Sequence, residues 1–389
     1  MPLQVREFYA NKSVLMTGIT GFVGKVLLEK FLREFPDFKR LYLLIRNKKN
    51  KTLEQRLMTE IFGSKIFVPL FRERPHLLKV IKERIVPVSG DLVIEGLGLQ
   101  PEMRAMMVDD LDVIINTAAS INFDDPIRDA LQINYFGALR VLELAHECKH
   151  LTVLHHVSTA YVNTNQPFDS VIPEEILPWG KGGQSYEASV RKIVDMEPQM
   201  LEREEKNILR EMGFPNTYTY TKNLAEQALQ ANRRPDLRIV ISRPSIITGT
   251  YRFPFEGWTD TVSAAGSVTY PYGMGMQRYE LFPDKIVASL IPCDYVVNSI
   301  LVTTAHVGSM SKPALNIFCV DTSFLNKDRY TLRRFFETQS RYFSKQVYTK
   351  RLDEPNVTFV PLKKDYDRLN AREILKKENK ILKVKQVFL

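Results

Sequence analysis

The sequence predicts an α/β protein with a doubly wound parallel sheet, followed by a smaller mixed α/β region and a basic helical tail. Apolar runs rich in Val, Ile and Leu alternate along the chain with helical patterns, as strands and crossover helices do in a parallel sheet that is buried on both faces. A glycine-rich stretch, TGITGFVG at residues 17–24, follows the first apolar run and opens the first helical pattern. That order is typical of a dinucleotide-binding βαβ unit.

The other expected elements divide the chain into three parts. The expected strands are the apolar runs at residues 12–17, 40–46, 84–88, 112–118, 151–157, 238–242 and 314–320. Helical patterns cover residues 22–35, 127–149, 223–231, 291–307, 331–345 and 371–385. Residues 249–284 are rich in Gly, Pro and aromatic side chains, which indicates irregular structure. We therefore expect a dinucleotide-binding domain with the catalytic residues at 1–248, a substrate-binding cap at 249–325 and a basic helical tail at 326–389.

The composition is that of a folded globular protein, with 44% hydrophobic and 25% charged residues in a chain of 389. The three cysteines, at positions 148, 293 and 319, are far apart and form no CxxC pair. We therefore expect no disulfide and no metal site, and an intracellular, reducing location. No signal peptide is evident, and no apolar run reaches the roughly 18 residues of a membrane-spanning helix.

The formal net charge of +9 is concentrated near the C-terminus. Between residues 327 and 385, 17 Lys and Arg stand against 8 Asp and Glu, so the rest of the chain is neutral. A solvated helical end accounts for this excess. So does contact with an acidic protein partner, with the anionic surface of an organelle membrane or with a phosphate-bearing substrate. No nucleic-acid-binding motif accompanies the charge, so we expect no nucleic-acid partner.

The glycine-rich stretch predicts contacts with a pyrophosphate. Glycine permits a tight turn after the strand and lets the backbone approach a phosphate at the helix N-terminus, where free N–H groups and the helix dipole favour anions. The residues expected to bind the cofactor here are Gly18, Thr20, Gly21, Phe22, Val23 and Gly24. A plain tight turn between strand and helix is the structural alternative.

The end of the second expected strand indicates which cofactor is bound. NAD-binding folds usually place Asp or Glu there, whereas this sequence has Arg46, followed by Asn47, Lys48 and Lys49. An arginine pairs bidentately with a 2′-phosphate, so the sequence favours NADP(H). The alternative is that Arg46 is merely an exposed residue at a strand end.

The next two strand ends add further cofactor contacts. Asp91, followed by Leu92, comes after the third strand, where an adenine amino group would arrive; a helix N-cap is the alternative role of Asp91. The small residues of NTAAS, among them Ala118, follow the fourth strand. Small side chains let a dinucleotide lie across the sheet where the strand order reverses.

YTYTK, at residues 218–222, predicts an acid–base pair. Tyr218 and Lys222 share one face at the start of a helix. An ammonium beside a phenol favours the phenolate, so we expect a lowered pKa for Tyr218 and assign it as proton donor. Ser158 and Thr159, at the end of the fifth strand, are expected to hydrogen-bond the same substrate oxygen. Tyr220 is the rival donor, but on a helix its side chain points away from that of Lys222.

His155 and His156 lie in the fifth strand, directly before these hydroxyl residues. Histidine is a frequent catalytic group and metal ligand, so the pair is a candidate for either role. The sequence offers no clustered metal-ligating partners, and we interpret both histidines as structural.

Several motifs together resemble the extended short-chain dehydrogenase/reductase superfamily, which has a Rossmann fold: TGITGFVG, STAY, the Tyr218-x-x-x-Lys222 pair and SRPSI. A narrower resemblance, over residues 5–310, is to the fatty acyl-CoA reductases. Its motifs are EFYANKSVLMTGITGFVGKVLLEKFLR, LYLLIR, HVSTAYVNT, PNTYTYTKNLAEQAL, RPSII, GWTD and IPCDYVVNSIL. This resemblance implies NADPH-dependent reduction of a long-chain acyl-CoA to a fatty alcohol through an aldehyde, in lipid metabolism such as ether-lipid or wax-precursor synthesis.

The resemblance also implies roles for single residues. The glycines hold the pyrophosphate, Arg46 holds the 2′-phosphate, Tyr218 donates the proton with Lys222 as its electrostatic partner, Thr159 or Ser158 orients the oxygen, and Pro244 and Ile246 lie against the nicotinamide. Relatives carry a longer helical C-terminal domain, so chain-length selectivity, the end product and membrane attachment stay open. Three further alternatives are a homodimer, a nucleotide-sugar or steroid substrate, and a role as an NADP(H)-binding structural subunit of a larger complex. The basic tail suggests the last of these.

Overall fold

The computed structural model describes residues 3–167, 169–180, 185–263, 265–281, 286–323, 330–345, 355, 358–360 and 362–372. The chain forms two compact units. The first comprises Met1–Ser245, Gly249–Thr259 and Pro292–Val320, and the second comprises Ile246–Thr248, Asp260–Ile291 and Asp321–Leu389. Each unit is described by itself below.

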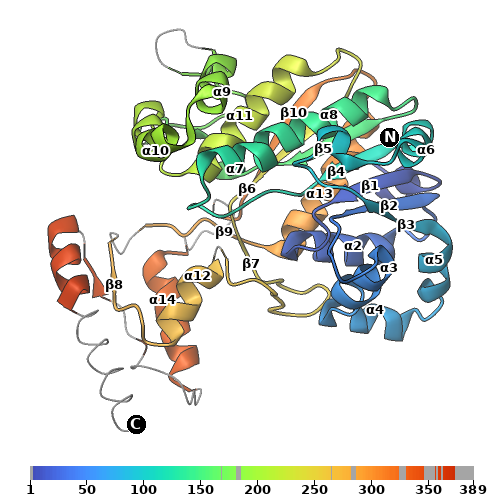
Figure 1. Cartoon of the computed structure of the whole chain (residues 1–389). Coiled ribbons are helices and arrows are strands. Elements are labelled where there is room, and N and C mark those ends of the chain that lie inside the picture. Colours follow the sequence, from blue (N-terminus) through green and yellow to red (C-terminus); the bar gives the residue numbers. More distant parts are fainter. Residues whose placement is uncertain are drawn as a thin grey trace. The chain divides into compact units, whose positions relative to one another are not determined.

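A seven-stranded sheet forms the centre of the first unit (Figure 1), in the order β10-β6-β5-β4-β1-β2-β3. Every neighbouring pair is parallel. The strands are β1 (Ser13–Thr17), β2 (Arg40–Ile45), β3 (Ile85–Ser89), β4 (Val113–Asn116), β5 (Val153–Val157), β6 (Ile239–Pro244) and β10 (Leu315–Val320). The predicted doubly wound parallel sheet is confirmed, and its strand order reverses between β1 and β4, where such sheets bind dinucleotides.

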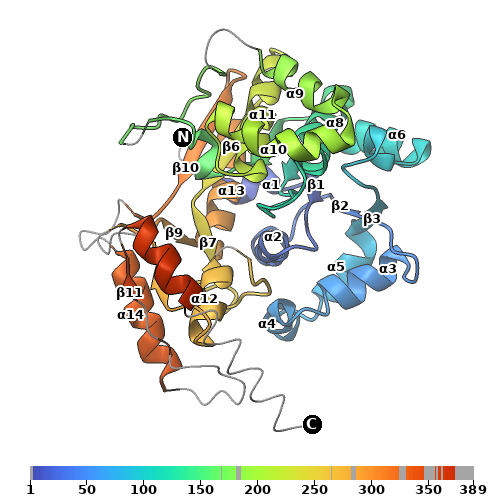
Figure 2. The same cartoon turned by 60° about the vertical axis from the view of Figure 1, so that its left-hand side comes forward.

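Helices cover both faces of this sheet and make three layers. On one face α2 (Phe22–Glu34) packs against α13 (Cys293–Gly308), which also contacts α1 (Val5–Tyr9); α2 is seen end-on in Figure 2. The other face carries α6 (Pro101–Asp110), α7 (Ile127–Leu131), α8 (Gly137–Glu147) and α11 (Thr217–Asn232). The strands are therefore buried on both sides, which explains why they read as apolar runs without alternation.

Shorter helices fill the connections. Between β2 and β3 lie α3 (Leu53–Arg56), α4 (Val68–Glu73) and α5 (Leu77–Arg84), and before α11 lie α9 (Tyr186–Asp195) and α10 (Pro198–Met212). The helix expected at residues 127–149 is α7 and α8 joined by a π-helical turn, Gln132–Phe136.

The first unit extends beyond the expected boundary at residue 248. α13 and β10 return to it because α13 packs on α2 and β10 pairs with β6. The loop at residues 249–259 returns as well. The buried Asp294 carboxylate, in the first turn of α13, accepts hydrogen bonds from the backbone N–H groups of Tyr251, Arg252 and Phe253 at 2.8, 3.0 and 3.2 Å.

Among the described residues, the second unit contains the helices α12 (Ala265–Gly273) and α14 (Leu332–Phe343) and a further helical stretch at residues 363–372. Its strands form two short pairs: β7 (Ile246–Thr248) with β9 (Leu290–Pro292), and β8 (Tyr279–Glu280) in parallel with β11 (Thr358–Phe359). The interpretation of residues 249–284 as irregular throughout is wrong, because α12 lies within them. In α14, Phe336 is buried against the ring of Tyr272, with ring centroids 5.1 Å apart.

Most of the helix expected at residues 371–385 lies outside the described residues, as does much of the basic tail. In the part of the chain that is described, no helix is long and apolar enough to cross a membrane. Within the same part, no group of three or more His, Cys, Asp or Glu side chains is arranged to hold a metal ion.

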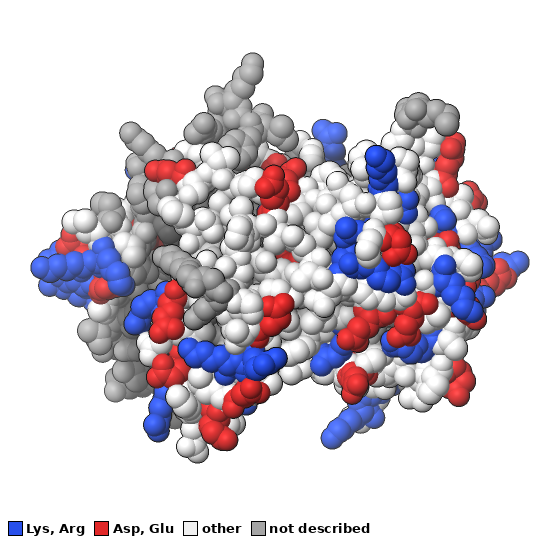
Figure 3. Space-filling view, turned by 90° about the horizontal axis from the view of Figure 1, so that it is seen from above, with Lys and Arg blue, Asp and Glu red and all other residues white. Residues whose placement is uncertain are grey.

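On the face drawn in Figure 3, acidic and basic side chains are intermingled, and uncharged side chains fill much of the middle.

A buried ion pair fixes α11 to the sheet. Arg243, at the end of β6, donates two hydrogen bonds to the Glu226 carboxylate on α11, at 3.2 and 2.6 Å, and both side chains are almost fully buried. Its guanidinium also donates to the carbonyl oxygens of Pro173 and Glu175. The ion pair therefore ties α11, β6 and the segment at residues 173–175 together.

Replacing Arg243 with Met leaves the Glu226 carboxylate buried without its cation. We expect this variant to lower the free energy of unfolding by about 3–5 kcal/mol, whereas Arg243→Met combined with Glu226→Leu regains most of the loss. Both tryptophans, Trp179 and Trp258, lie in the first unit, so urea unfolding followed by tryptophan fluorescence reports on that unit. Equal losses in the single and double variants would contradict the assigned role of the pair.

Candidate active site

The glycine turn after β1 has the geometry of a pyrophosphate site. Gly18 has a φ of +72°, and a Cβ there would lie 2.7 Å from the backbone nitrogen of Ala118. A Cβ on Gly24 would lie 2.3 Å from the Gly18 carbonyl oxygen, so both positions require glycine. Gly21 caps α2 without a side-chain hydrogen bond. The N-terminal N–H groups of α2 can therefore face an anion, and the turn fits a dinucleotide.

The other residues expected near the pyrophosphate lie at the same place. Thr20 and Gly21 are exposed in the turn, and Phe22 and Val23 begin α2 half-buried. Ala118 lies across the reversal point, after β4, and its N–H donates to Thr17 Oγ1 at 3.2 Å. The structure thus brings the glycine turn and Ala118 together, as the sequence predicts.

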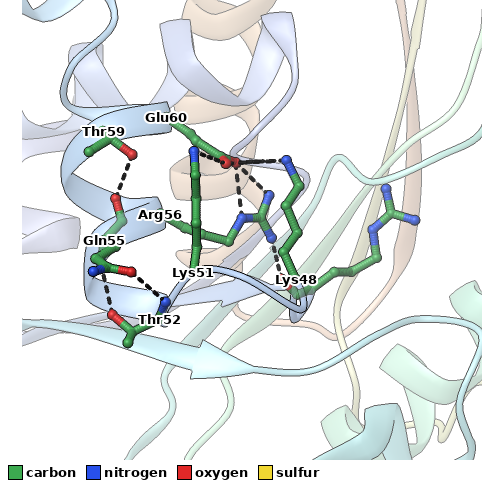
Figure 4. A network of polar contacts seen from close by, with 8 residues as sticks. Lys48, Lys51, Thr52, Gln55, Arg56, Thr59 and Glu60 are labelled. Atoms are coloured by element: carbon green, nitrogen blue, oxygen red, sulfur yellow. Dashed lines mark hydrogen bonds and ion pairs between the residues drawn. The ribbon is translucent and has the colours of Figure 1, made fainter.

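A cationic cluster follows β2, next to Arg46 (Figure 4). The Arg56 guanidinium donates to the backbone carbonyl of Arg46 and pairs with Glu60 at 2.8 Å. Lys48 and Lys51 also reach Glu60, at 3.2 and 3.1 Å. Hydrogen bonds from Arg56, Lys51 and Lys48 lower the pKa of Glu60 to about 2. The exposed Arg46 guanidinium takes no part in these three ion pairs.

Asp91 and Leu92 follow β3 in a turn. The Asp91 carboxylate accepts a hydrogen bond from the backbone of Val93 at 3.2 Å, which is an Asx-type turn rather than a helix N-cap. Arg140 donates to the Leu92 carbonyl at 2.7 Å. Contact of either residue with an adenine stays a prediction.

The predicted proton donor lies in the first turn of α11. Asn216 caps this helix by accepting from the backbone of Thr219 at 2.9 Å, so Tyr218 begins the helix near the carboxyl end of β5. The Thr159 side chain is the polar group that acts on the pKa of its phenol. Burial raises the pKa of Tyr218 to about 12, and the hydrogen bond with Thr159 opposes this rise.

The expected lowering of the Tyr218 pKa is therefore wrong. Lys222 is 1% exposed, and its amine donates to the Val157 carbonyl at 2.6 Å and lies 3.1 Å from His156 Nε2. Burial lowers the pKa of Lys222 to about 8, with Glu226 opposing that shift. Since desolvation of the phenol dominates, Tyr218 stays neutral, which is the form that can donate a proton.

The two histidines of β5 have different surroundings. His155 is hydrogen-bonded to Thr304 at 2.7 Å and to Ser242 at 2.9 Å, and burial lowers its pKa to about 3, which agrees with a structural role. His156 contacts Lys222 directly, and its other ring nitrogen lies 3.1 Å from the Asn116 amide. The sequence interpretation missed this contact. No local signal in the sequence indicates this contact, because Lys222 lies 66 residues further along the chain.

The hydroxyl groups after β5 also differ. Thr159 accepts from the backbone of Tyr161 at 3.3 Å and contacts the Tyr218 phenol. Ser158 Oγ is buried and has no hydrogen-bond partner in the part of the chain that is described. The structure therefore brings Thr159 to Tyr218, and it leaves the Ser158 hydroxyl unsatisfied.

Tyr220 lies away from these groups. Its ring packs between those of Phe214 and Trp179, with centroids 5.4 and 5.8 Å away, in the apolar cluster between α9, α10 and α11. This agrees with the prediction that it points away from Lys222.

Pro244 ends β6 in the first unit, whereas Ile246 begins β7 in the second. Their contact with a nicotinamide stays a prediction.

Comparison with known proteins identifies the family. Residues 16–300 match the family model described as "Male sterility protein". Fatty acyl-CoA reductase 1 of Arabidopsis thaliana is 34% identical, over 90% of this chain and 74% of that protein. The alcohol-forming fatty acyl-CoA reductase of Simmondsia chinensis is 33% identical, over 88% of this chain and 73% of that protein.

Solved structures agree on the fold. The terminal R domain of the myxalamid PKS-NRPS pathway has a TM-score of 0.64 at 22% identity, over 93% of this chain and 75% of that one. Fold and comparisons together define an oxidoreductase with a Rossmann domain that binds a nicotinamide cofactor. Within that class, the chain belongs to the fatty acyl-CoA reductase family, whose members reduce fatty acyl groups.

The buried amine of Lys222 predicts a pH limit for reduction. Its pKa is lowered to about 8, so the ammonium present below that pH is lost as the pH rises through it. We expect kcat/KM, which reports on the free enzyme, to fall above about pH 8. In Lys222→Arg the guanidinium stays protonated, so we expect the decrease in kcat/KM to move to higher pH. A decrease at the same pH as in the wild type would mean that another group titrates.

Proposed function

We propose that this chain reduces a long-chain fatty acyl-CoA to the fatty alcohol through an aldehyde, with NADPH as the reductant. One observation carries the proposal: Tyr218 lies in the first turn of α11, one helical turn before the buried Lys222, whose amine is held by the Val157 carbonyl and His156. Membership of the fatty acyl-CoA reductase family supports the acyl-CoA substrate. The relative from Simmondsia chinensis, which is named as alcohol-forming, supports the alcohol as the end product.

The proposed chemistry gives each group of the site one task. The nicotinamide cofactor, when bound, supplies hydride to the substrate's carbonyl carbon. Tyr218 donates its proton to the carbonyl oxygen, and the Thr159 hydroxyl donates a hydrogen bond to the same oxygen as negative charge develops there. In the first reduction the C–S bond then breaks, and CoA leaves as the thiol to give the aldehyde. After the Tyr218 phenolate regains a proton from water, a second hydride and a second proton from Tyr218 convert the aldehyde to the alcohol.

Lys222 acts after proton donation in this scheme. Loss of the proton leaves a phenolate in a buried site, and an ammonium one helical turn away stabilises that charge. His156 and the Val157 carbonyl keep the amine in place, and we assign it a contact with the cofactor as well. The unpaired hydroxyl of Ser158 is the second candidate for holding the substrate oxygen.

We propose NADPH because of the charges after β2. No carboxylate stands at the end of that strand; Arg46 is exposed there, and Lys48, Lys49 and Lys51 follow it closely in the sequence. In this proposal Arg46 pairs with the 2′-phosphate, and Arg56 holds its backbone. The other residues assigned to the cofactor are Gly18, Thr20, Gly21, Phe22, Val23, Gly24, Asp91, Leu92, Ala118, Pro244 and Ile246.

The activity is tested by NADPH oxidation with palmitoyl-CoA and identification of the products by mass spectrometry. We expect fatty alcohol from the wild type and a loss of about 10²–10⁴-fold in rate for Tyr218→Phe, because the proton donor is removed. Tyr220→Phe is the matched control, because its hydroxyl lies in the apolar cluster and has no role in the site. Nucleotide binding without turnover on any acyl-CoA would refute the proposal and favour a structural subunit.

The cofactor preference is tested by direct binding. We expect Arg46→Ser to weaken NADPH binding by about 10–100-fold, the value of hydrogen bonds to a charged group, and to leave NADH binding unchanged. Lys49→Ser removes an exposed cation three residues away and serves as the control. Titration of nucleotide fluorescence measures both constants, and equal weakening of NADH in Arg46→Ser would contradict the assignment to the 2′-phosphate.

A further inference from the structure

An exposed apolar patch lies beside the candidate proton donor. The loop between β4 and α7 carries Ile121 and Phe123, whose residues are 51% and 57% exposed. The Phe123 ring stacks on that of Tyr218, with centroids 5.8 Å apart and planes inclined by 26°. Two large apolar side chains on one short loop at a reactive group form a patch of the kind that marks a ligand-binding surface.

The loop that carries the patch is held in place by hydrogen bonds. Buried Asn134 binds the Ser120 backbone on both sides, accepting from its N–H at 2.9 Å and donating to its carbonyl at 3.1 Å. Thr217, the residue before Tyr218, donates to the carbonyls of Asp125 at 2.9 Å and Phe123 at 3.3 Å. These bonds fix the loop to the helix that carries the phenol, so the exposure of the patch is built into the fold.

We propose that Phe123 and Ile121 form the surface that binds the acyl chain of the substrate directly beyond the reacting carbonyl. The inference rests on the proposed function and adds a specificity site to it. When the carbonyl oxygen of the substrate lies within hydrogen-bond distance of the Tyr218 phenol, the adjacent carbon atoms of the acyl chain lie next to the Phe123 ring, because that ring stacks on Tyr218. Burying those methylene groups against Phe123 and Ile121 removes apolar surface of both partners from water.

The chemistry of the loop favours the acyl chain over the pantetheine arm of CoA. The pantetheine arm carries amides that need hydrogen-bond partners once they are buried. The side chains of Phe123 and Ile121 offer none, and the polar side chains of Ser120 and Asn122 already bind the Asp125 carboxylate. Because two side chains cover only the first carbons of a chain, the preference should rise with chain length and then level off.

Aldehyde substrates test the assignment, because they carry the chain without CoA. Steady-state NADPH oxidation is measured with butanal, octanal, dodecanal and hexadecanal, and with the matching acyl-CoA esters. We expect Phe123→Ala to lower kcat/KM for octanal and longer aldehydes about tenfold relative to butanal, mainly through KM, with a smaller effect for Ile121→Ala. Phe123→Leu should retain most of the preference. Val68→Ala removes an exposed apolar side chain on α4 and serves as control.

Three outcomes would overturn the assignment. A uniform fall in kcat at every chain length would mean that Phe123 only positions the Tyr218 ring. An effect on acyl-CoA esters without one on aldehydes would move the contact to the pantetheine arm. A wild-type chain-length profile in both alanine variants would remove the site and leave the proposed function intact, whereas no reduction by the wild type at any length would reject the proposed function itself. Tryptophan fluorescence verifies that each variant is folded.

Discussion

Burial of the Lys222 amine at the carboxyl end of β5 is the constraint on which the candidate site depends. An amine removed from water needs hydrogen-bond partners, and here they are the Val157 carbonyl and His156. His156 in turn contacts Asn116, whose side chain accepts from Thr17 at 2.6 Å. Thr17 directly precedes the glycine turn. One buried chain of polar contacts therefore joins α11, which carries the proposed proton donor Tyr218, to β1, which precedes the glycine turn.

An ion pair also fixes α11 to the sheet. Glu226 lies one turn after Lys222 and is bound by Arg243 at the end of β6, so successive turns of α11 are tied to neighbouring strands. At its N-terminus, Thr217 ties the helix to the loop after β4. The polar contacts of Thr217, Lys222 and Glu226 thus fix the part of α11 that carries Tyr218. The Tyr218 side chain itself is half-buried. A phenol that must meet a substrate oxygen needs such support, because small misplacements of a catalytic group cost rate steeply.

The parts of this arrangement that follow from short stretches of sequence could be predicted. The glycine turn lies within one strand–helix connection, and Tyr218 and Lys222 lie on one helix, so both could be predicted from local spacing. The apolar runs predicted the strands of the parallel sheet. The role of His156 depends on Asn116 and Lys222, which are 40 and 66 residues away along the chain, and the stack of Phe123 on Tyr218 is equally non-local. Likewise, the Gly, Pro and aromatic content of residues 249–284 indicated irregular structure, yet α12 lies within them and contains Pro271. Burial, which reverses the expected pKa shift of Tyr218, arises only from packing.

That reversal favours one direction of the chemistry. A phenol whose pKa is raised to about 12 holds its proton at neutral pH and releases it only to an oxygen that gains charge, as in carbonyl reduction. Alcohol oxidation by the same site would need the phenolate as a base, which burial disfavours. The Thr159 side chain opposes the rise in the Tyr218 pKa without making the phenolate the resting form. Desolvation of Tyr218 therefore keeps on the phenol the proton that the proposed carbonyl reduction requires.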